Sequence, residues 1–417
     1  MKRDVVRDLS GQIRTKFESV DCVVLLGPRQ VGKTYLSRGL IAESGPTGQY
    51  LDLATDGAQP VVANLGEFLD ENAGSLVVLD EAQARPELFP RLRHWLDQPR
   101  SPEFVAPKIL LLGSASAHIQ RLAAESLGGR YAFADLTAFQ LSELETKKPA
   151  LAVASGIGMI PEVADIEDVG DHNATRLWLR GGWPLAYFDV DDQVSIQRRL
   201  DFIRSYIEHD IPAFDVAAGS DKIGEFWNAI ARNQGQPFHS GSFGAMQVKA
   251  ETAERYIRCL ERLHLLRLLK PWFTNVEKRH TKNPRAYVRD SGLLHALLGL
   301  HSQEALEADP MAGKSWEGFV IETLVVARGR DDAAFFYRDD NQNEIDLVLE
   351  FEGKRRWAIE IKLGSDPNVR AGFHAAAEAV GAERRIIVHG GPHPSDQVKD
   401  IDALTISDVM REVRAYS

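Results

Sequence analysis

The sequence predicts an α/β protein that opens with a parallel sheet, continues through helices and a hairpin, and ends in a second α/β domain. Three observations support this fold class. Apolar runs at residues 22–26, 75–79 and 108–112 have the length of buried parallel strands, and a helical pattern follows the first of them. Helical spacing of apolar residues dominates the middle of the chain. From residue 301 onward, strand-like runs return with helical segments between them.

Length and composition narrow the class of protein. The 417 residues exceed what one hydrophobic core supports, so we expect two to four domains. No apolar run reaches the ~18 residues that span a bilayer, and no apolar signal core follows the first charges, so we expect a cytoplasmic protein with no membrane partner. Two cysteines make a disulfide framework or a zinc site unexpected. The net charge of −11 argues against coating DNA by bulk charge, although a local basic patch remains compatible with it.

A glycine-bearing loop follows the first apolar run directly. Residues 27–34 match G-x-x-x-x-G-K-[ST], the Walker A pattern, with the strand before it and the helix after it that the motif requires. Gly27 and Gly32 permit the turn that brings backbone amides to phosphates. Lys33 is expected to reach the β- and γ-phosphates of ATP, and the Thr34 hydroxyl to bind Mg²⁺. The expected nucleotide-binding residues are Gly27, Pro28, Arg29, Gln30, Val31, Gly32, Lys33, Thr34 and Tyr35.

Polar residues also end the other two apolar runs. Asp80 is predicted to hold magnesium through water, and Glu81 to act as the catalytic base that orients the attacking water. A plain carboxylate pair at a strand end is the alternative, which the upstream Walker A pattern weakens. Ser114 follows the third run, and ligands of open α/β sheets bind at the carboxyl ends of strands, so its hydroxyl is a candidate sensor of the γ-phosphate. An ordinary turn serine explains the same pattern equally well.

These motifs resemble a known family. The runs at residues 27–34, Leu-Asp-Glu-Ala-Gln, Leu-Leu-Gly-Ser and Ser-Leu-Gly-Gly-Arg resemble bacterial and archaeal AAA-type ATPases with a C-terminal domain of unknown function. The resemblance implies an AAA-like ATPase core over residues 1–145, with ATP and Mg²⁺ as cofactors. It also makes Arg130 a candidate arginine finger that acts across a subunit interface, which implies a homo-oligomer. A structural salt bridge of Arg130 is the open alternative.

Residues 146–215 are expected to form a linker and a helical lid. Residues 149–171 are rich in Gly, Ala and Asp, and residues 195–209 have an amphipathic helical pattern. Between them, residues 177–184 resemble the Gly-Gly-aromatic-Pro signature of the same family. Arg180 in this run is expected either to approach the nucleotide or to precede a glycine turn that caps a helix.

Residues 216–300 have the pattern of a winged helix, since helical stretches precede a hairpin with a basic loop. The third helix of such modules enters the major groove of DNA, and the wing contacts the backbone. A solvated helix face with paired glutamates, or a protein-binding or lid module, explains the pattern as well. The candidate DNA-binding residues are Lys249, Arg255, Arg258, Arg262, Lys278 and Arg279.

Residues 301–417 carry Glu317 in a helical pattern, Asp346 in a strand-like run, and then Glu360 and Lys362 in another. This order resembles the PD-(D/E)xK nuclease superfamily, and it implies a restriction-endonuclease-like α/β domain. The resemblance makes Glu317, Asp346 and Glu360 metal ligands and Lys362 a catalytic residue beside them. The pattern is short and degenerate, so an ion pair of Lys362 without metal remains an alternative.

Together these features predict an ATP-hydrolysing protein that acts on DNA, in repair or in defence, and couples a P-loop motor to a winged helix and a nuclease-like domain. Two alternatives remain open from the sequence. One is an ATP-dependent signalling switch. The other is a DNA clamp whose C-terminal domain binds without cleaving.

Overall fold

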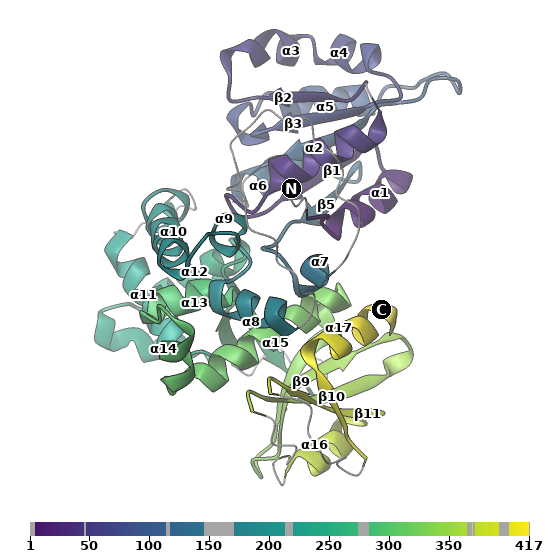
Figure 1. Cartoon of the computed structure of the whole chain (residues 1–417). Coiled ribbons are helices and arrows are strands. Elements are labelled where there is room, and N and C mark those ends of the chain that lie inside the picture. The colour runs from purple at the N-terminus through teal and green to yellow at the C-terminus, as the bar shows by residue number, and fades with distance from the viewer. Residues whose placement is uncertain are drawn as a thin grey trace. The chain divides into compact units, whose positions relative to one another are not determined.

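The computed structural model in Figure 1 describes residues 5–45, 47–113, 117–145, 171–212, 220–273, 283–364, 369, 372–391 and 400–416. The chain forms two compact units. The first contains the described residues up to Phe139 together with Arg262–His264, and the second contains the other described residues. The α/β fold class with a parallel sheet is confirmed, and the second unit contains a mixed sheet.

The first unit is built on a five-stranded sheet in which every neighbouring pair is parallel. All five residues of β1 and of β3 are buried, as expected of strands that are covered on both faces. The spatial order of the strands is β2 (Gln49–Asp52), β3 (Leu76–Asp80), β4 (Lys108–Leu112), β1 (Cys22–Leu26) and β5 (Tyr131–Asp135). The helices are α1 (Leu9–Ser19), α2 (Lys33–Ser44), α3 (Gln59–Ala63), α4 (Leu65–Glu71), α5 (Leu88–Leu96) and α6 (Ala117–Leu127).

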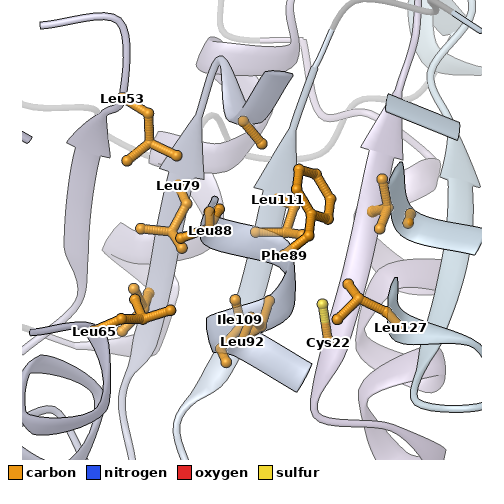
Figure 2. Close-up of a cluster of buried hydrophobic side chains, with 14 of the residues drawn as sticks. Cys22, Leu53, Leu65, Leu79, Leu88, Phe89, Leu92, Ile109, Leu111 and Leu127 are labelled. Atoms are coloured by element: carbon orange, nitrogen blue, oxygen red, sulfur yellow. The ribbon is translucent and has the colours of Figure 1, made fainter. Parts of the chain in front are cut away.

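Alternate residues along these strands belong to two separate hydrophobic clusters. Val23, Leu25 and Val78 join Leu36 and Leu40 of α2 in one cluster. The other, drawn in Figure 2, contains Cys22, Leu79 and Leu111 of the strands with Phe89 and Leu92 of α5. Each fully buried side chain of this size contributes about 1.5–3 kcal/mol relative to exposure. The two clusters therefore fix the sheet between helices and hold the carboxyl ends of its strands in place.

In the second unit, a short turn that contains Gly181 and Gly182 connects α8 (Asp171–Arg180) to α9 (Pro184–Tyr187). A Cβ atom on Gly181, whose φ is +74°, would lie 2.0 Å from Asp290 Oδ1. The half-buried Asp290 carboxylate accepts hydrogen bonds from Gly182 N (2.7 Å) and Leu293 N (2.9 Å), and its desolvation raises its pKa to about 6. The helices are α7 (Leu141–Glu145), α8 (Asp171–Arg180), α9 (Pro184–Tyr187), α10 (Asp192–Ser205), α11 (Ser220–Arg232), α12 (Ala250–Arg262), α13 (Ser291–Leu298), α14 (Gln303–Ala308), α15 (Ala312–Arg328), α16 (Phe373–Val380) and α17 (Ile406–Tyr416).

Arg180 is part of the same packing. Its Nε lies 2.7 Å from Asp192 Oδ1, and its Nη1 donates to Asp189 O at 2.6 Å. The residue is only 8% exposed. These contacts hold the guanidinium inside the second unit, and they favour the structural interpretation of the Gly-Gly turn over a nucleotide contact.

The second unit also contains a seven-stranded mixed sheet. β6 and β7 form an antiparallel hairpin, and β6 pairs in parallel with β8 through Lys270–Phe335 and Pro271–Phe336. The hairpin within residues 216–300 therefore shares one sheet with the strands of the C-terminal segment. The spatial order is β12 (Asp402–Thr405), β11 (Arg384–His389), β10 (Arg356–Lys362), β9 (Glu344–Glu350), β8 (Ala334–Arg338), β6 (Leu266–Pro271) and β7 (Arg285–Val288).

Candidate functional site

The phosphate-binding loop lies at the carboxyl edge of the first sheet. It follows β1 and leads into α2, and β4 separates β1 from β3, whose last residue is Asp80. Because all five strands are parallel, the loop and Asp80 lie at the same edge. Ser114, the candidate sensor of the γ-phosphate, lies outside the described residues.

The backbone of the loop requires its glycines. A Cβ atom on Gly27 would lie 2.4 Å from Leu136 O, so no larger residue fits there. Gly32 has φ +101°, and Gln30 also adopts positive φ, at 59°. α2 begins at Lys33, with Tyr35 in its first turn. The unbonded amides and the positive dipole end of this helix make the loop suitable for an anion such as a phosphate.

Lys33 lies against its own loop. Its Nζ donates hydrogen bonds to Gly27 O (2.8 Å) and Pro28 O (2.9 Å). Both acceptors are neutral carbonyls, whereas a phosphate is a charged acceptor and a stronger partner for an ammonium. The position of Lys33 therefore fits its predicted contact with the nucleotide.

Asp80 and Thr34 supply oxygen atoms suited to Mg²⁺. Thr34 Oγ1 donates to Asp80 Oδ2 at 3.1 Å, and Glu81 N donates to Asp80 Oδ1 at 2.8 Å. Asp80 is only 6% exposed. Magnesium prefers hydroxyl, carboxylate and phosphate oxygens and keeps several waters. The Thr34 hydroxyl and the Asp80 carboxylate therefore suit the Mg²⁺ that P-loop enzymes use.

Glu81 has an unusual backbone. Its φ of 52° and ψ of 44° lie in the left-handed region, which a residue with a Cβ atom adopts at a cost. The Glu81 side chain is exposed and accepts a hydrogen bond from Gln83 Nε2. Such backbone strain concentrates at functional sites. The position directly after Asp80 fits the predicted role of Glu81 in orienting water.

Two residues of this site have no motif in the sequence. Arg7 Nη1 donates to Val31 O in the loop (2.9 Å), and Arg7 Nη2 donates to Thr137 O (2.6 Å). The Tyr50 hydroxyl donates to Asp80 Oδ2 at 2.5 Å. These contacts join residues 24, 130 and 30 positions apart, so a local pattern offers no signal for them.

Arg130 lies at the opposite edge of the same sheet, since it directly precedes β5. Its Nε pairs with Asp97, and its Nη1 donates to Gly128 O at 2.8 Å. Five residues of strand span roughly 16 Å, so Arg130 is far from the phosphate-binding loop of its own chain.

The candidate nuclease residues occupy the predicted elements. Glu317 lies in α15, Asp346 in β9, and Glu360 and Lys362 in β10. Asp346 and Glu360 are fully buried, Asp346 Oδ2 accepts from Ile361 N at 3.0 Å, and Lys362 Nζ lies 3.8 Å from Glu360 Oε1.

Glu317 has partners of its own. Its Oε1 accepts from the Tyr287 hydroxyl at 2.8 Å, and its Oε2 pairs with Lys314. Among the residues that the structure describes, no group of three or more His, Cys, Asp or Glu is arranged to hold a metal ion. The structure therefore does not gather Glu317, Asp346 and Glu360 into a three-carboxylate metal centre.

The basic face of α12 is exposed. Ala253, Tyr256, Ile257 and Leu260 bury the other face. Arg258 pairs with Glu254 at 3.5 Å, and Glu251 and Glu261 are also exposed, so acidic side chains accompany the basic ones. Lys278 and Arg279 lie outside the described residues. The exposed candidates for DNA contact are Lys249, Arg255, Arg258 and Arg262.

Over the described ranges, no helix combines the length and the apolar character that crossing a membrane requires.

Comparison with known proteins places the site in a family. The model of an AAA domain matches residues 20–145, and two domains of unknown function, DUF8612 and DUF4143, match residues 171–304 and 312–409. The predicted AAA-type ATPase with a C-terminal domain of unknown function is thereby confirmed.

Two relatives cover most of the chain. They are uncharacterized proteins of Mycobacterium bovis and Mycobacterium tuberculosis, each 34% identical over 393 residues, or 93% of this chain and 80% of the relative. A Walker-type ATPase of Pyrococcus abyssi is 16% identical, covering 72% of this chain and 99% of its own, with a TM-score of 0.46. The chain therefore belongs to the family of these two mycobacterial proteins, and it is a P-loop ATPase of the AAA type.

Proposed function

We propose that this protein hydrolyses ATP with Mg²⁺ and uses the turnover to act on DNA through its winged-helix segment and its C-terminal α/β domain. The observation that carries the ATPase part is the contact of Thr34 with Asp80 beside the phosphate-binding loop, with Glu81 next in the chain. Hydroxyl, carboxylate and loop amides are the parts that a P-loop enzyme needs.

Each residue has a separate task in this reaction. The amides of the loop and of the first turn of α2 bind the phosphates, and Lys33 adds a positive charge to them. Thr34 and Asp80 hold Mg²⁺, which neutralises charge that develops on the phosphates when it is bound. Glu81 orients the attacking water and accepts its proton.

The proposal of DNA as the partner rests on α12. Its buried face fixes the helix, so Arg255, Arg258 and Arg262 project from the opposite side at helical spacing. Arginine side chains on an exposed helix contact phosphates readily. The three glutamates of the same helix balance the charge of its three arginines, which favours contacts to the DNA backbone at a few points over coating by charge.

Reversing the charge of Arg255 and Arg258 together, as Arg255→Glu and Arg258→Glu, is expected to weaken DNA binding at least about tenfold for every sequence. Two lost phosphate contacts also lower the slope of log affinity against log salt by about 2. Fluorescence anisotropy with two labelled duplexes of unrelated sequence, over a range of KCl concentrations, measures both quantities. Arg330→Glu is the matched control, since Arg330 is exposed and paired with Asp332 in the same unit.

Two results would oppose the DNA proposal. Unchanged affinity for DNA in the double variant would show that α12 does not contact DNA. ATP turnover that does not respond to any DNA favours the alternative of a signalling switch.

A second candidate function concerns the C-terminal domain alone, which we propose to bind DNA without cutting it. The observation that favours binding over cleavage is that, among the described residues, Glu317 does not form a metal-holding group of three with Asp346 and Glu360. A nuclease of the predicted type needs its helix carboxylate for the metal.

The purified protein, incubated with supercoiled plasmid and Mg²⁺ or Mn²⁺, is therefore expected to leave the DNA intact on an agarose gel. The control is a parallel binding assay under the same conditions, which shows that DNA was bound. Nicked or linear products that disappear in Asp346→Ala would establish cleavage and overturn the clamp proposal.

A further inference from the structure

Tyr50 lies beside the metal-binding carboxylate although it is thirty residues away in sequence. It belongs to β2, and the register with β3 pairs Tyr50 with Val78 and Asp52 with Asp80. The ring packs against the hydrophobic cluster that contains Leu36, Leu40 and Val78. Tyrosine in such a place presents an apolar body to the core and a polar tip to the site.

The two carboxylate oxygens of Asp80 accept hydrogen bonds from different donors. Oδ2 accepts from the Tyr50 hydroxyl at 2.5 Å and from Thr34 Oγ1 at 3.1 Å. Oδ1 accepts from Glu81 N at 2.8 Å. A carboxylate oxygen has two lone-pair positions, so both positions of Oδ2 are used and one position of Oδ1 remains.

We propose that Tyr50 is a positioning residue for Asp80, and that its hydroxyl directs the carboxylate so that Oδ1 receives the water bound to magnesium. Thr34 and Tyr50 come from different elements, α2 and β2, and both pin Oδ2. The carboxylate of Asp80, at the end of β3, is thereby fixed from both sides. Partners of metal-binding groups orient those groups and tune metal affinity in this way.

The ring that carries this hydroxyl has a further contact, to Arg38 of α2. The guanidinium of Arg38 lies over the Tyr50 ring, 4.9 Å from its centroid, and restrains the ring. The inference rests on the proposed use of Mg²⁺ with ATP at this site.

The test replaces Tyr50 by phenylalanine, which removes one oxygen and keeps the ring in the core. Binding of a fluorescent ATP analogue is titrated with Mg²⁺ and, separately, in EDTA. The Mg²⁺ concentration for half-maximal tightening is expected to rise about tenfold, the usual effect of losing such a partner. Affinity in EDTA should stay at the wild-type value, because the loop and Lys33 are untouched. Tyr131→Phe, in β5 of the same sheet, is the matched control and should leave both quantities unchanged.

The outcomes separate the positioning role from a structural one. Tyr50→Phe with the wild-type Mg²⁺ dependence overturns the inference, whether or not its melting temperature falls. An equal loss of affinity in EDTA also overturns it, because Tyr50 would then support the loop and not the metal site. A wild-type protein whose nucleotide affinity ignores Mg²⁺ instead overturns the proposed function.

Discussion

Replacing Glu81 by glutamine is expected to leave ATP binding intact and to lower kcat by about 10²–10⁴-fold, the usual contribution of a positioned base. The amide retains the size of the side chain but cannot accept the proton of the attacking water. Because the phosphates contact the loop and not Glu81, affinity for ATP should change little. Phosphate release and binding of a fluorescent ATP analogue measure the two quantities.

Substitutions of the same residue types elsewhere in the first unit serve as controls for this prediction. Glu87→Gln makes the same chemical change at an exposed position six residues further along, and it should keep the parental rate. Lys33→Ala should lose both binding and turnover, since the phosphates lose their nearest cation, while Lys108→Ala removes a lysine that pairs with Asp21 and should have no effect. Parental turnover in Glu81→Gln would show that Glu81 is not the base.

The difference between Glu81 and Tyr50 illustrates what the sequence could predict at this site. Lys33, Thr34, Asp80 and Glu81 were predictable because each is fixed by a motif next to a buried strand, and strand ends of a parallel sheet meet at one edge. Tyr50 was not, because a tyrosine in a short strand is most simply explained as core, and its contact with Asp80 depends on the order of strands in space.

The C-terminal segment shows the same limit at another scale. The order of Glu317, Asp346, Glu360 and Lys362 on a helix and two strands was predictable from periodicity. The contact of Glu317 with Tyr287 was not predictable from the sequence. Tyr287 reaches Glu317 from β7, a strand of the preceding segment that joins the C-terminal sheet through β6 and β8. Pairing between residues 65 positions apart leaves no local trace in the sequence, since it depends on which sheet edge is available.

Removing Arg130 is expected to lower kcat by about 10³-fold or more while the protein stays folded, if Arg130 is the finger of a neighbouring subunit. Its own nucleotide lies at the other edge of the sheet, so only a second copy of the chain offers Arg130 a phosphate. The ion pair of Arg130 with Asp97 contributes little to stability, about 0–1 kcal/mol, because the two side chains are 35% and 40% exposed. Asp97→Asn, which breaks the pair and keeps the arginine, should therefore retain activity and serves as the control.

Mixing subunits distinguishes a finger from a salt bridge. Arg130→Ala and Lys33→Ala subunits are each inactive alone, but in an equal mixture about a quarter of the interfaces of a cyclic oligomer combine an intact loop with an intact finger. ATP turnover should recover in proportion. A protein that remains a monomer by light scattering with and without ATP would contradict the prediction, as would an Arg130→Ala variant with parental turnover. The second result would leave Arg130 the task its contacts already describe, which is to tie the start of β5 to Asp97 after α5.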